Sequence, residues 1–430
     1  MPSVVPAVAR PPLRLSAALV IAAAWSCGGS GGPAPLASPA PANGRTVRAA
    51  PRRPSLPAGE DSCDAYAYYR YGRAQLHDHP AAAAAAFYWM QRLAPTSPLG
   101  YYSQRVALLM EDRRLLRGYI EEDRRTLQSA RVAQIDSLQI RAMTLDPFFP
   151  QALDEDLLVA YFTYRIGNEM RSQATPTPFV SDGQIEGYVR TYVQEFADSS
   201  TRAWFAYGRG AYGEAAATWA AELRRDSTGT DLRARRAQAL YLLGELDSAR
   251  VELERALATA RRAETRSMRY AYDSKVLWEY EVGRIHERLG DAAGAREAYQ
   301  RALVEDLSFY PAHLRLGFLA AAGGDTATAV TELSRALEIK DDDFSSRLLL
   351  GIVLGSHRDF ERATEQLRRA AEIEPWTAVP HFVMGNVKRA AGDRDGALEE
   401  YRRFLAMAGP NDPNLLPARE RVAALSAPGQ

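Results

Sequence analysis

A six-residue pattern that returns at a fixed interval decides the fold of this chain. Its four evenly spaced copies are Gly290-Asp-Ala-Ala-Gly-Ala295, Gly324-Asp-Thr-Ala-Thr-Ala329, Arg358-Asp-Phe-Glu-Arg-Ala363 and Gly392-Asp-Arg-Asp-Gly-Ala397. Each copy ends in alanine, and successive closing alanines are 34 residues apart. A fixed period of about 20 to 50 residues is typical of chains built from stacked structural repeats. The sequence therefore predicts a repeat architecture.

The pattern extends toward the N-terminus in two earlier copies, Gly210-Ala-Tyr-Gly-Glu-Ala215 and Gly244-Glu-Leu-Asp-Ser-Ala249. Ala215 and Ala249 are again 34 residues apart, but Ala295 follows Ala249 by 46. Insertions between repeats fall in loops or in extended helices. The excess is therefore assigned to the charged stretch around residues 261–269.

Each position of the pattern has a physical purpose. Glycine at the start suits the left-handed backbone at the end of a helix. Alanine lets two helix backbones approach closely, and a large residue four positions later fills the space between them. A second set of glycines lies eight positions into successive repeats, where two helices are expected to touch, and it includes Gly317, Gly351 and Gly385.

This pattern resembles the tetratricopeptide repeat family, in which each repeat is a pair of antiparallel helices. The resemblance implies an all-α fold, an α-solenoid of stacked antiparallel helix pairs wound into a superhelix, with six repeats in residues 196–410. Weaker junction signals, such as Leu145-Asp146-Pro147, predict degenerate helical repeats in residues 61–195. Residues 411–430 are expected to form a capping helix and a tail, because the end of a solenoid needs a polar cover.

Residues 1–26 have the composition of an export signal. Arg10 and Arg14 precede the apolar run 15–25, which is shorter than the roughly 20 residues of a membrane-spanning helix. The following Ala24-Trp25-Ser26-Cys27 resembles the lipobox of bacterial lipoproteins, which implies that Cys27 becomes the first mature residue and carries a lipid. The alternatives are ordinary cleavage after Ala24, which would release a soluble protein, and an uncleaved membrane anchor.

Residues 27–60 are expected to be a disordered tether, since Gly, Ala, Pro and Ser dominate and apolar periodicity is missing. With a lipid on Cys27, the protein would be anchored in the bacterial envelope. Gly28 after the cysteine, by analogy with lipoprotein sorting, favours the periplasmic face of the outer membrane. Cys63 would remain without a cysteine partner in the chain, so no intrachain disulfide is expected.

The composition argues against several function classes. The 53 basic and 53 acidic residues cancel, and no long basic run offers a footprint for nucleic acid, so no nucleic-acid partner is expected. Residues 208–213 match the dinucleotide-binding spacing of glycines, but a helix is expected before them where that motif requires a strand. The repeat turn explains these glycines, and no cofactor is predicted.

Metal and catalytic candidates are weak. His77-Asp78-His79 is the densest metal-like cluster, but side chains two apart on a helix face different directions, so no metal site is predicted. The chain is predicted not to be an enzyme. The alternative is an active site within residues 61–200, where Asp154, Glu155, Asp156 and Glu169 cluster.

The family resemblance also implies a binding surface, because the first helices of its repeats line a concave groove. The corresponding residues here are Trp204, Tyr207, Tyr241, Tyr280, Arg284, Phe318, Ile352, Phe382, Asn386 and Arg389. Aromatic residues and arginine are enriched at binding hot spots. We therefore expect an envelope-anchored scaffold or adaptor that binds a protein or peptide partner, with a secreted subunit of a homo-oligomer as the alternative. The subgroup of the family that clamps a peptide carboxylate has only one partial match here, Asn386.

Overall fold

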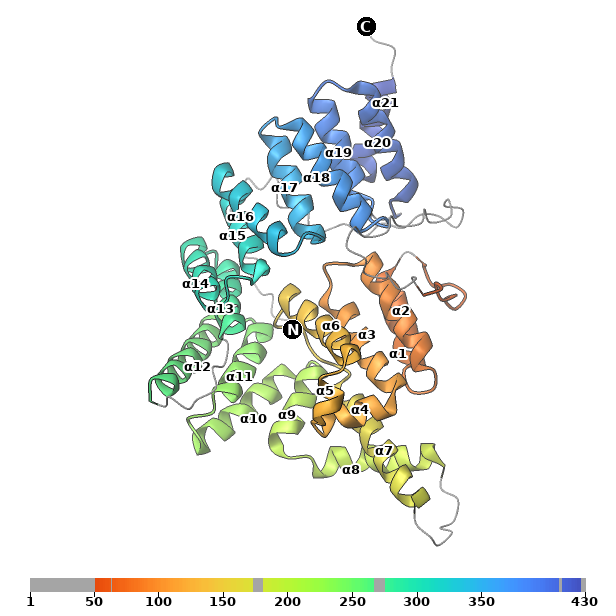
Figure 1. Ribbon diagram of the computed structural model, residues 1–430, viewed down its shortest axis with the longest axis vertical. Coiled ribbons are helices and arrows are strands. Elements are labelled where there is room, and N and C mark those ends of the chain that lie inside the picture. Colours follow the sequence, from red (N-terminus) through yellow and green to blue (C-terminus); the bar gives the residue numbers. More distant parts are fainter. Residues whose placement is uncertain (1–50, 63, 173–180, 267–274, 410–411, 427–430) are drawn as a thin grey trace, which may run out of the picture.

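A computed structural model describes residues 51–62, 64–172, 181–266, 275–409 and 412–426 of the protein. Within these residues every regular element is a helix, and the all-α prediction is confirmed (Figure 1). The predicted signal, Cys27 and most of the predicted tether lie outside the described residues, as does Cys63. None of the described helices is both long enough and apolar enough to cross a membrane.

The N-terminal part contains eight helices among the described residues. They are α1 (Ala65–Gln75), α2 (Pro80–Leu93), α3 (Pro98–Glu111), α4 (Arg113–Ile120), α5 (Arg124–Leu127), α6 (Ala130–Leu145), α7 (Asp154–Ser172) and α8 (Asp182–Phe196). The alanine-rich α2 begins with Pro80, which fits the first turn of a helix because its missing N–H would have no partner there. Helices α1, α2, α3 and α6 pack in succession, whereas α7 lies against α4 and α8.

The repeat region follows, and its described residues form twelve helices in antiparallel pairs. They are α9 (Ser199–Gly208), α10 (Tyr212–Arg225), α11 (Thr230–Leu243), α12 (Leu246–Arg266), α13 (Val276–Leu289), α14 (Ala292–Glu305), α15 (Tyr310–Ala322), α16 (Thr326–Ile339), α17 (Phe344–Ser356), α18 (Phe360–Ile373), α19 (Val379–Ala390) and α20 (Arg394–Met407). A last helix, α21 (Leu415–Ser426), packs against α20 at the end of the stack.

The irregular spacing between the second and third copies of the pattern has a local cause. Helix α12 has 21 residues, whereas α10 and α14 have 14 each. The insertion therefore lengthens the second helix of its repeat, as far as the structure describes it, and the neighbouring helix pairs keep their packing.

In the four pairs from α13 to α20, the turn consists of a left-handed residue followed by an aspartate that caps the second helix. Gly290, Gly324 and Gly392 have φ of 78°, 79° and 85°. The aspartate after each glycine caps the second helix, and its side chain accepts a hydrogen bond from the backbone N–H three residues later. In the remaining copy Arg358 adopts φ of 64°, and Asp359 still caps α18.

The closing alanines lie at the points where paired helices touch. All six are fully buried: Ala215, Ala249, Ala295, Ala329, Ala363 and Ala397. Glycines on the first helices allow the same close approach. A Cβ atom at Gly351 would lie 2.6 Å from Leu367, and one at Gly317 or Gly385 would meet Leu333 or Tyr401 at a similar distance. Larger residues at these positions would push the paired helices apart.

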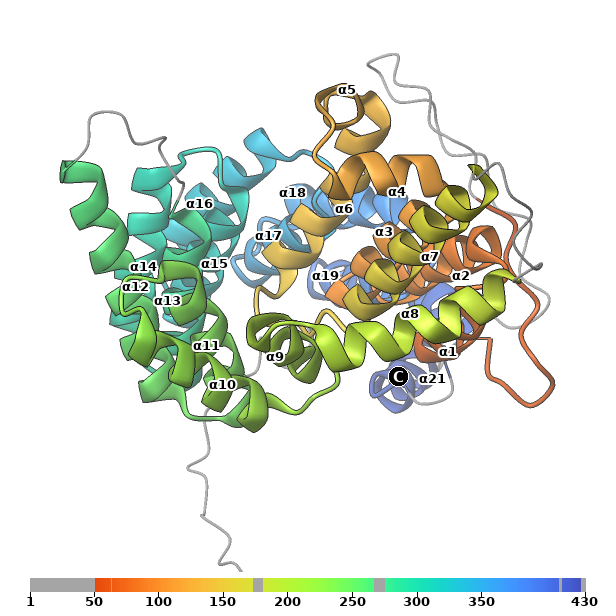
Figure 2. The same ribbon diagram turned by 90° about the horizontal axis from the view of Figure 1, so that it is seen from below.

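The stack curves, and the N-terminal helices occupy its inner side. Helices α9 to α17 form an arc, and α6 lies inside it with α1 to α3 beyond (Figure 1). The view from below shows the same arrangement, with α6 between the arc and α3 (Figure 2). The residues predicted as degenerate repeats therefore fold back against the concave face of the later ones.

The left-handed Arg358 gives a stability prediction. A side chain in this backbone region costs about 1 to 2 kcal/mol, which glycine avoids. The variant Arg358→Gly should therefore raise the free energy of unfolding by about 0.5 to 1 kcal/mol, after allowance for the greater freedom of glycine in the unfolded chain. Urea unfolding followed by circular dichroism measures the change.

Gly324→Ala is the matched control, because Gly324 has the same backbone conformation and an added Cβ would meet no atom within 4 Å. It should lower the free energy of unfolding by about 1 kcal/mol, through backbone strain alone. If both variants changed the free energy of unfolding by the same amount in the same direction, the left-handed backbone at these turns would not limit stability.

Candidate functional site

The concave surface of the first repeats holds a segment of the same chain. We call residues 141–151 the internal strap: it comprises the last turn of α6 and the first part of the loop that leads to α7. Its backbone carbonyl groups accept hydrogen bonds from side chains of the arc. Tyr280 Oη donates to the carbonyl of Thr144 at 3.2 Å, and Arg284 Nη1 donates to that of Leu145 at 3.1 Å.

The first helices of the two preceding repeats, α11 and α9, also contact backbone carbonyl groups of the strap. From α11, Gln238 Nε2 lies 3.5 Å from the carbonyl oxygen of Pro147 and donates to Glu281 at 2.9 Å. From α9, Tyr207 Oη donates to the carbonyl of Phe148 at 2.8 Å. The strap therefore runs along the arc in the direction opposite to the order of the repeats, and its main chain is held at successive repeats.

One strap side chain is an anchor. The ring of Phe148 stacks on that of Tyr241, with centroids 3.6 Å apart and planes at 11°, and Phe148 is fully buried. Burial of such a ring contributes about 1.5 to 3 kcal/mol, and the aromatic pair adds about 0.5 to 1.5 kcal/mol. The anchor thus adds side-chain selectivity to a contact made largely through the backbone.

The strap is also close to the backbone of α9. A Cβ atom at Gly208 would lie 2.9 Å from the carbonyl oxygen of Gln151, closer than side chains approach a backbone atom. Nearby, Trp204 stacks on Tyr207 and donates its indole N–H to Asp154 at 2.8 Å. The glycine that sequence comparison with a dinucleotide motif singles out is therefore required for close packing of two chain segments.

The N-terminal helices also contact the repeats farther along the arc. Arg141 Nη1 lies 3.0 Å from the fully buried carboxylate of Asp343 and also donates to Tyr310. From α2, Arg92 pairs with Glu374 at 2.9 Å. In the same place Trp89 meets Trp376 edge-on, with ring centroids 5.5 Å apart. These contacts join the N-terminal helices to the loops that begin successive repeats.

The structure divides the ten predicted groove residues into groups. Trp204, Tyr207, Tyr241, Tyr280 and Arg284 contact the internal strap or Asp154 just after it. At the other end, α21 covers two more, because the guanidinium group of Arg421 lies over the ring of Phe382 and donates to Asn386. Phe318 and Ile352 are half-buried, and Arg389 is exposed.

Sequence reasoning missed the chain segment that occupies the groove, and it missed one groove residue, Gln238, that contacts this segment. Residues 145–147 were interpreted as a junction between repeats, which they are locally, since α6 ends there. Gln238 occupies the same repeat position as Arg284, Phe318, Ile352 and Asn386, eleven residues before the closing alanine, so the repeat register was a signal for it that the list of predicted groove residues left unused. The only signal for the chain segment itself was the run of prolines and aromatic residues in 147–150, which disfavours a helix and favours an extended chain.

A buried acid lies beneath the strap. Glu281 on α13 is almost completely buried, and its Oε2 has no hydrogen-bond partner among the described residues. Burial raises the pKa of Glu281 to about 8; the charge of Asp146 acts in the same direction, while the hydrogen bond from Gln238 lowers it. The carboxyl group is therefore largely protonated at neutral pH.

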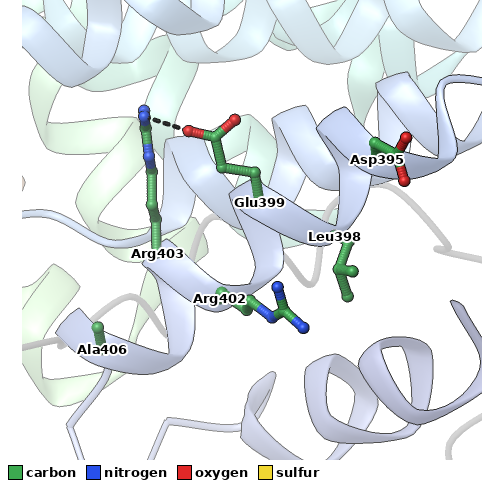
Figure 3. Close-up of a pocket in the computed structure, with 6 residues that line it drawn as sticks. All are labelled: Asp395, Leu398, Glu399, Arg402, Arg403 and Ala406. Atoms are coloured by element: carbon green, nitrogen blue, oxygen red, sulfur yellow. Dashed lines mark hydrogen bonds and ion pairs between the residues drawn. The ribbon is translucent and has the colours of Figure 1, made fainter. Parts of the chain in front are cut away.

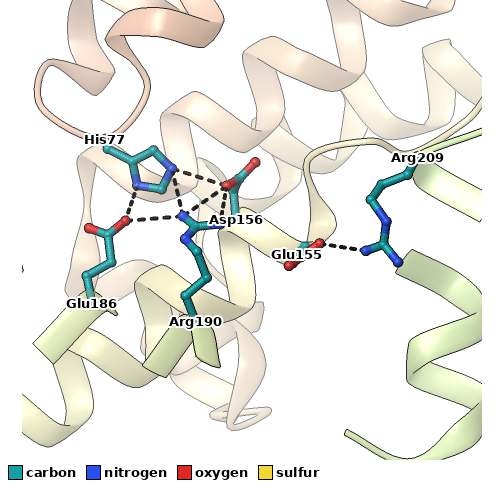
Figure 4. Close-up of polar contacts among 6 residues, drawn as sticks. All are labelled: His77, Glu155, Asp156, Glu186, Arg190 and Arg209. Carbon is teal, nitrogen blue, oxygen red and sulfur yellow. Dashed lines mark hydrogen bonds and ion pairs between the residues drawn. The ribbon is translucent and has the colours of Figure 1, made fainter. Parts of the chain in front are cut away.

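His77, in the loop between α1 and α2, joins that loop to α7 and α8. His77 Nε2 lies 3.1 Å from Asp156 on α7, and its Nδ1 lies 3.2 Å from Glu186 on α8, where Arg190 also pairs with both acids (Figure 4). The hydrogen bond with Asp156 raises the pKa of His77, although burial lowers it. In the described part of the chain no group of three or more His, Cys, Asp or Glu residues is arranged to hold a metal ion. His79 is exposed.

The acidic cluster that motivated the enzyme alternative separates into individual contacts. Asp154 accepts from Tyr102 at 2.8 Å as well as from Trp204, and burial raises its pKa. Glu155 pairs with Arg209 at 3.0 Å, away from the His77 group (Figure 4). Glu169 is exposed farther along α7. The four acids do not converge on one cavity.

A surface hollow of about 460 Å³ lies on the second helix of the last repeat. Its lining residues are Asp395, Leu398, Glu399, Arg402, Arg403 and Ala406. All six belong to α20, and the dashed line in Figure 3 is an ion pair between Arg403 and Glu399 on that helix. Ligand sites surround their ligand with groups from several elements. This hollow lacks such an arrangement.

Antiparallel helix pairs stacked with a 34-residue period around a concave face define an α-solenoid of the tetratricopeptide type. Residues 280–344, from α13 to the start of α17, match the family model for the tetratricopeptide repeat. No curated protein matches the chain.

Several solved structures are similar to parts of the chain. YrrB, described as a TPR protein with an unusual peptide-binding site, is 18% identical, with a TM-score of 0.39 over 48% of this chain and 99% of its own. The C-terminal part of a TPR repeat-containing protein from Cytophaga hutchinsonii is 15% identical, with a TM-score of 0.43 over 53% and 95%. A thermophilic TPR protein from Thermus thermophilus is 21% identical, with a TM-score of 0.32 over 46% and 98%.

The protonated Glu281 gives a pH prediction. The unfolded chain loses this proton near pH 4.3, whereas the folded chain keeps it until about pH 8. The folded state therefore binds more protons in this window, and this residue makes the free energy of unfolding fall as the pH rises. Glu281→Gln should remove that fall, so the variant gains stability relative to wild type between pH 5 and pH 8.

Urea unfolding of both proteins at several pH values measures this difference. Glu287→Gln on the same helix is a control. Glu287 forms an ion pair with Arg315, so its neutralisation should lower the free energy of unfolding of the protein. A constant difference between wild type and Glu281→Gln across the window would contradict a protonated Glu281.

Proposed function

We propose that the protein is an envelope-anchored scaffold that binds a protein or peptide partner, as part of a membrane-associated assembly. A solenoid offers a long surface made of successive, similar units, which suits an extended ligand. The described residues contain the helix pairs and the concave face that such a role requires.

One observation carries the binding part of the proposal. The first helices of three successive repeats hold the C-terminal end of α6 and the loop after it, with Tyr280 and Arg284 donating to the last carbonyl groups of α6 and Tyr207 donating to the carbonyl of Phe148. Donors that grip backbone carbonyls recognise a chain segment largely independently of its side chains. The surface therefore has the chemistry needed to bind a peptide.

The envelope part of the proposal rests on the sequence. Residues 1–26 have the pattern of an export signal, and Cys27 stands where bacterial lipoproteins carry their lipid. The predicted tether extends to residue 60, but the carbonyl of Pro51 already accepts a hydrogen bond from Trp89 on α2, so the spacer would be residues 27–50, which as a flexible coil would span about 27 Å. Under this proposal the protein works as a non-catalytic component, consistent with the dispersed acids of α7.

The anchoring proposal is tested by the location of the full chain. Wild type should sediment with membranes, and Cys27→Ser should move to the soluble exported fraction, because the lipid can no longer be attached. The matched control is Cys63→Ser, which removes the other cysteine and should leave the protein on the membrane. Unchanged sedimentation of Cys27→Ser would contradict a lipid anchor.

The scaffold proposal is tested by co-purification after crosslinking in cells. A tagged full chain should enrich a defined envelope protein, because the helical part supplies the binding surface. The control is a tagged residue 1–60 fragment, which shares the predicted signal and tether but lacks every described helix. If the fragment enriches the same proteins to the same extent, the solenoid is not the binding element.

A further inference from the structure

The internal strap matches a bound peptide in its position and in its contacts. We infer that residues 141–151 are an intramolecular ligand that closes the concave surface of α9, α11 and α13 to partners. The inference further assigns the kind of partner that opens this surface: a segment that presents free backbone carbonyl groups, as the end of a helix and the loop after it do, and that carries an aromatic residue in the place of Phe148. It rests on the proposed binding function of the solenoid and specifies both its ligand chemistry and its control.

The ligand chemistry follows from the way the strap is held. Its backbone, at Thr144, Leu145 and Phe148, supplies the groups that the arc recognises, so most side chains of a replacement segment are free to vary. The exceptions are the ring that stacks on Tyr241 and, at the other end of the strap, the guanidinium group of Arg141 that pairs with Asp343. A proline before this ring favours the required backbone, because proline disfavours helix.

The closed state is favoured by attachment of the strap to the repeats it covers. A tethered ligand acts at an effective concentration on the order of millimolar, so a free segment with the same contacts competes poorly. To displace the strap, a partner must therefore make contacts that the strap does not make, or bind first to a surface that is exposed while the strap is in place. The half-buried Phe318 and exposed Arg389, farther along the first helices, lie beyond the strap residues.

The contact of Arg141 with Asp343 can break when the strap leaves the groove, without loss of the cap on α17. Asp343 caps α17 and accepts hydrogen bonds from the backbone N–H and the hydroxyl group of Ser346, each at 2.8 Å. These two bonds do not involve the strap. When Arg141 leaves, the Asp343 carboxylate keeps both of them, so the repeat beneath remains capped.

The test uses a labelled synthetic peptide of residues 140–151 and the full chain. The double variant Arg141→Ala with Phe148→Ala weakens both ends of the strap but alters no residue of the concave surface. Fluorescence anisotropy should show that the peptide binds this variant at least about 10 times more tightly than wild type, in which the surface is occupied.

Two controls define the expected specificity. A peptide with Phe148→Ala should bind the double variant at least about 10 times more weakly than the unaltered peptide, since it lacks the stacking ring. Adding Tyr241→Ala to the double variant should have the same effect on the unaltered peptide. A folded double variant that binds both peptides as weakly as wild type does would overturn the inference.

A second measurement applies if circular dichroism shows that the double variant does not fold. In wild type, amide hydrogen exchange should be at least about 10 times faster in residues 144–151 than in the buried turns of α13, because the strap opens without global unfolding. Exchange of both segments through global unfolding alone would overturn the inference. Neither measurement needs an envelope partner, so a failure here is distinct from a failure of the scaffold proposal.

Discussion

The close approach of two helices in each pair is the constraint on which the rest of the structure depends. It requires a buried alanine on the second helix and, in several repeats, a glycine on the first, as Ala363 and Gly351 illustrate. A pair packed in this way still exposes an apolar face, which only a neighbouring pair can cover. The regular offset between neighbouring pairs produces the curved stack, and the curvature produces a concave face.

The concave face explains the fold of the N-terminal helices. Hydrogen-bond donors and aromatic rings recur along the arc because the same helix positions recur, so a chain segment lying across them meets a similar contact at each repeat. The internal strap uses this regularity, with carbonyl groups held by α13 and α9 and a ring stacked on α11. The same residues thus form the binding surface and pack the strap. Under the inference above, the strap and a partner compete for this groove.

The sequence allowed the repeat positions, the all-α class and the left-handed turns to be predicted, because each depends on residues close together in the chain. Tyr280 and Arg284 were also found as members of a surface, through their place in the repeat. Their ligands were not found, since Thr144 and Leu145 precede them by well over a hundred residues and carry no matching period. Recognition through backbone carbonyls leaves almost no trace in the side chains of the segment that is bound.

The sequence by itself determined the local rules of this protein: which helices pair, where they turn, and which faces they must bury. The export signal and Cys27 are likewise features of the sequence alone, and they remain predictions. Only the tertiary structure decided what lies in the groove, how the acids of α7 are used, and that Glu281 is buried beneath the strap. The physical reason is that periodic packing is encoded by near neighbours, whereas the path of an irregular segment depends on the whole curved surface against which it folds.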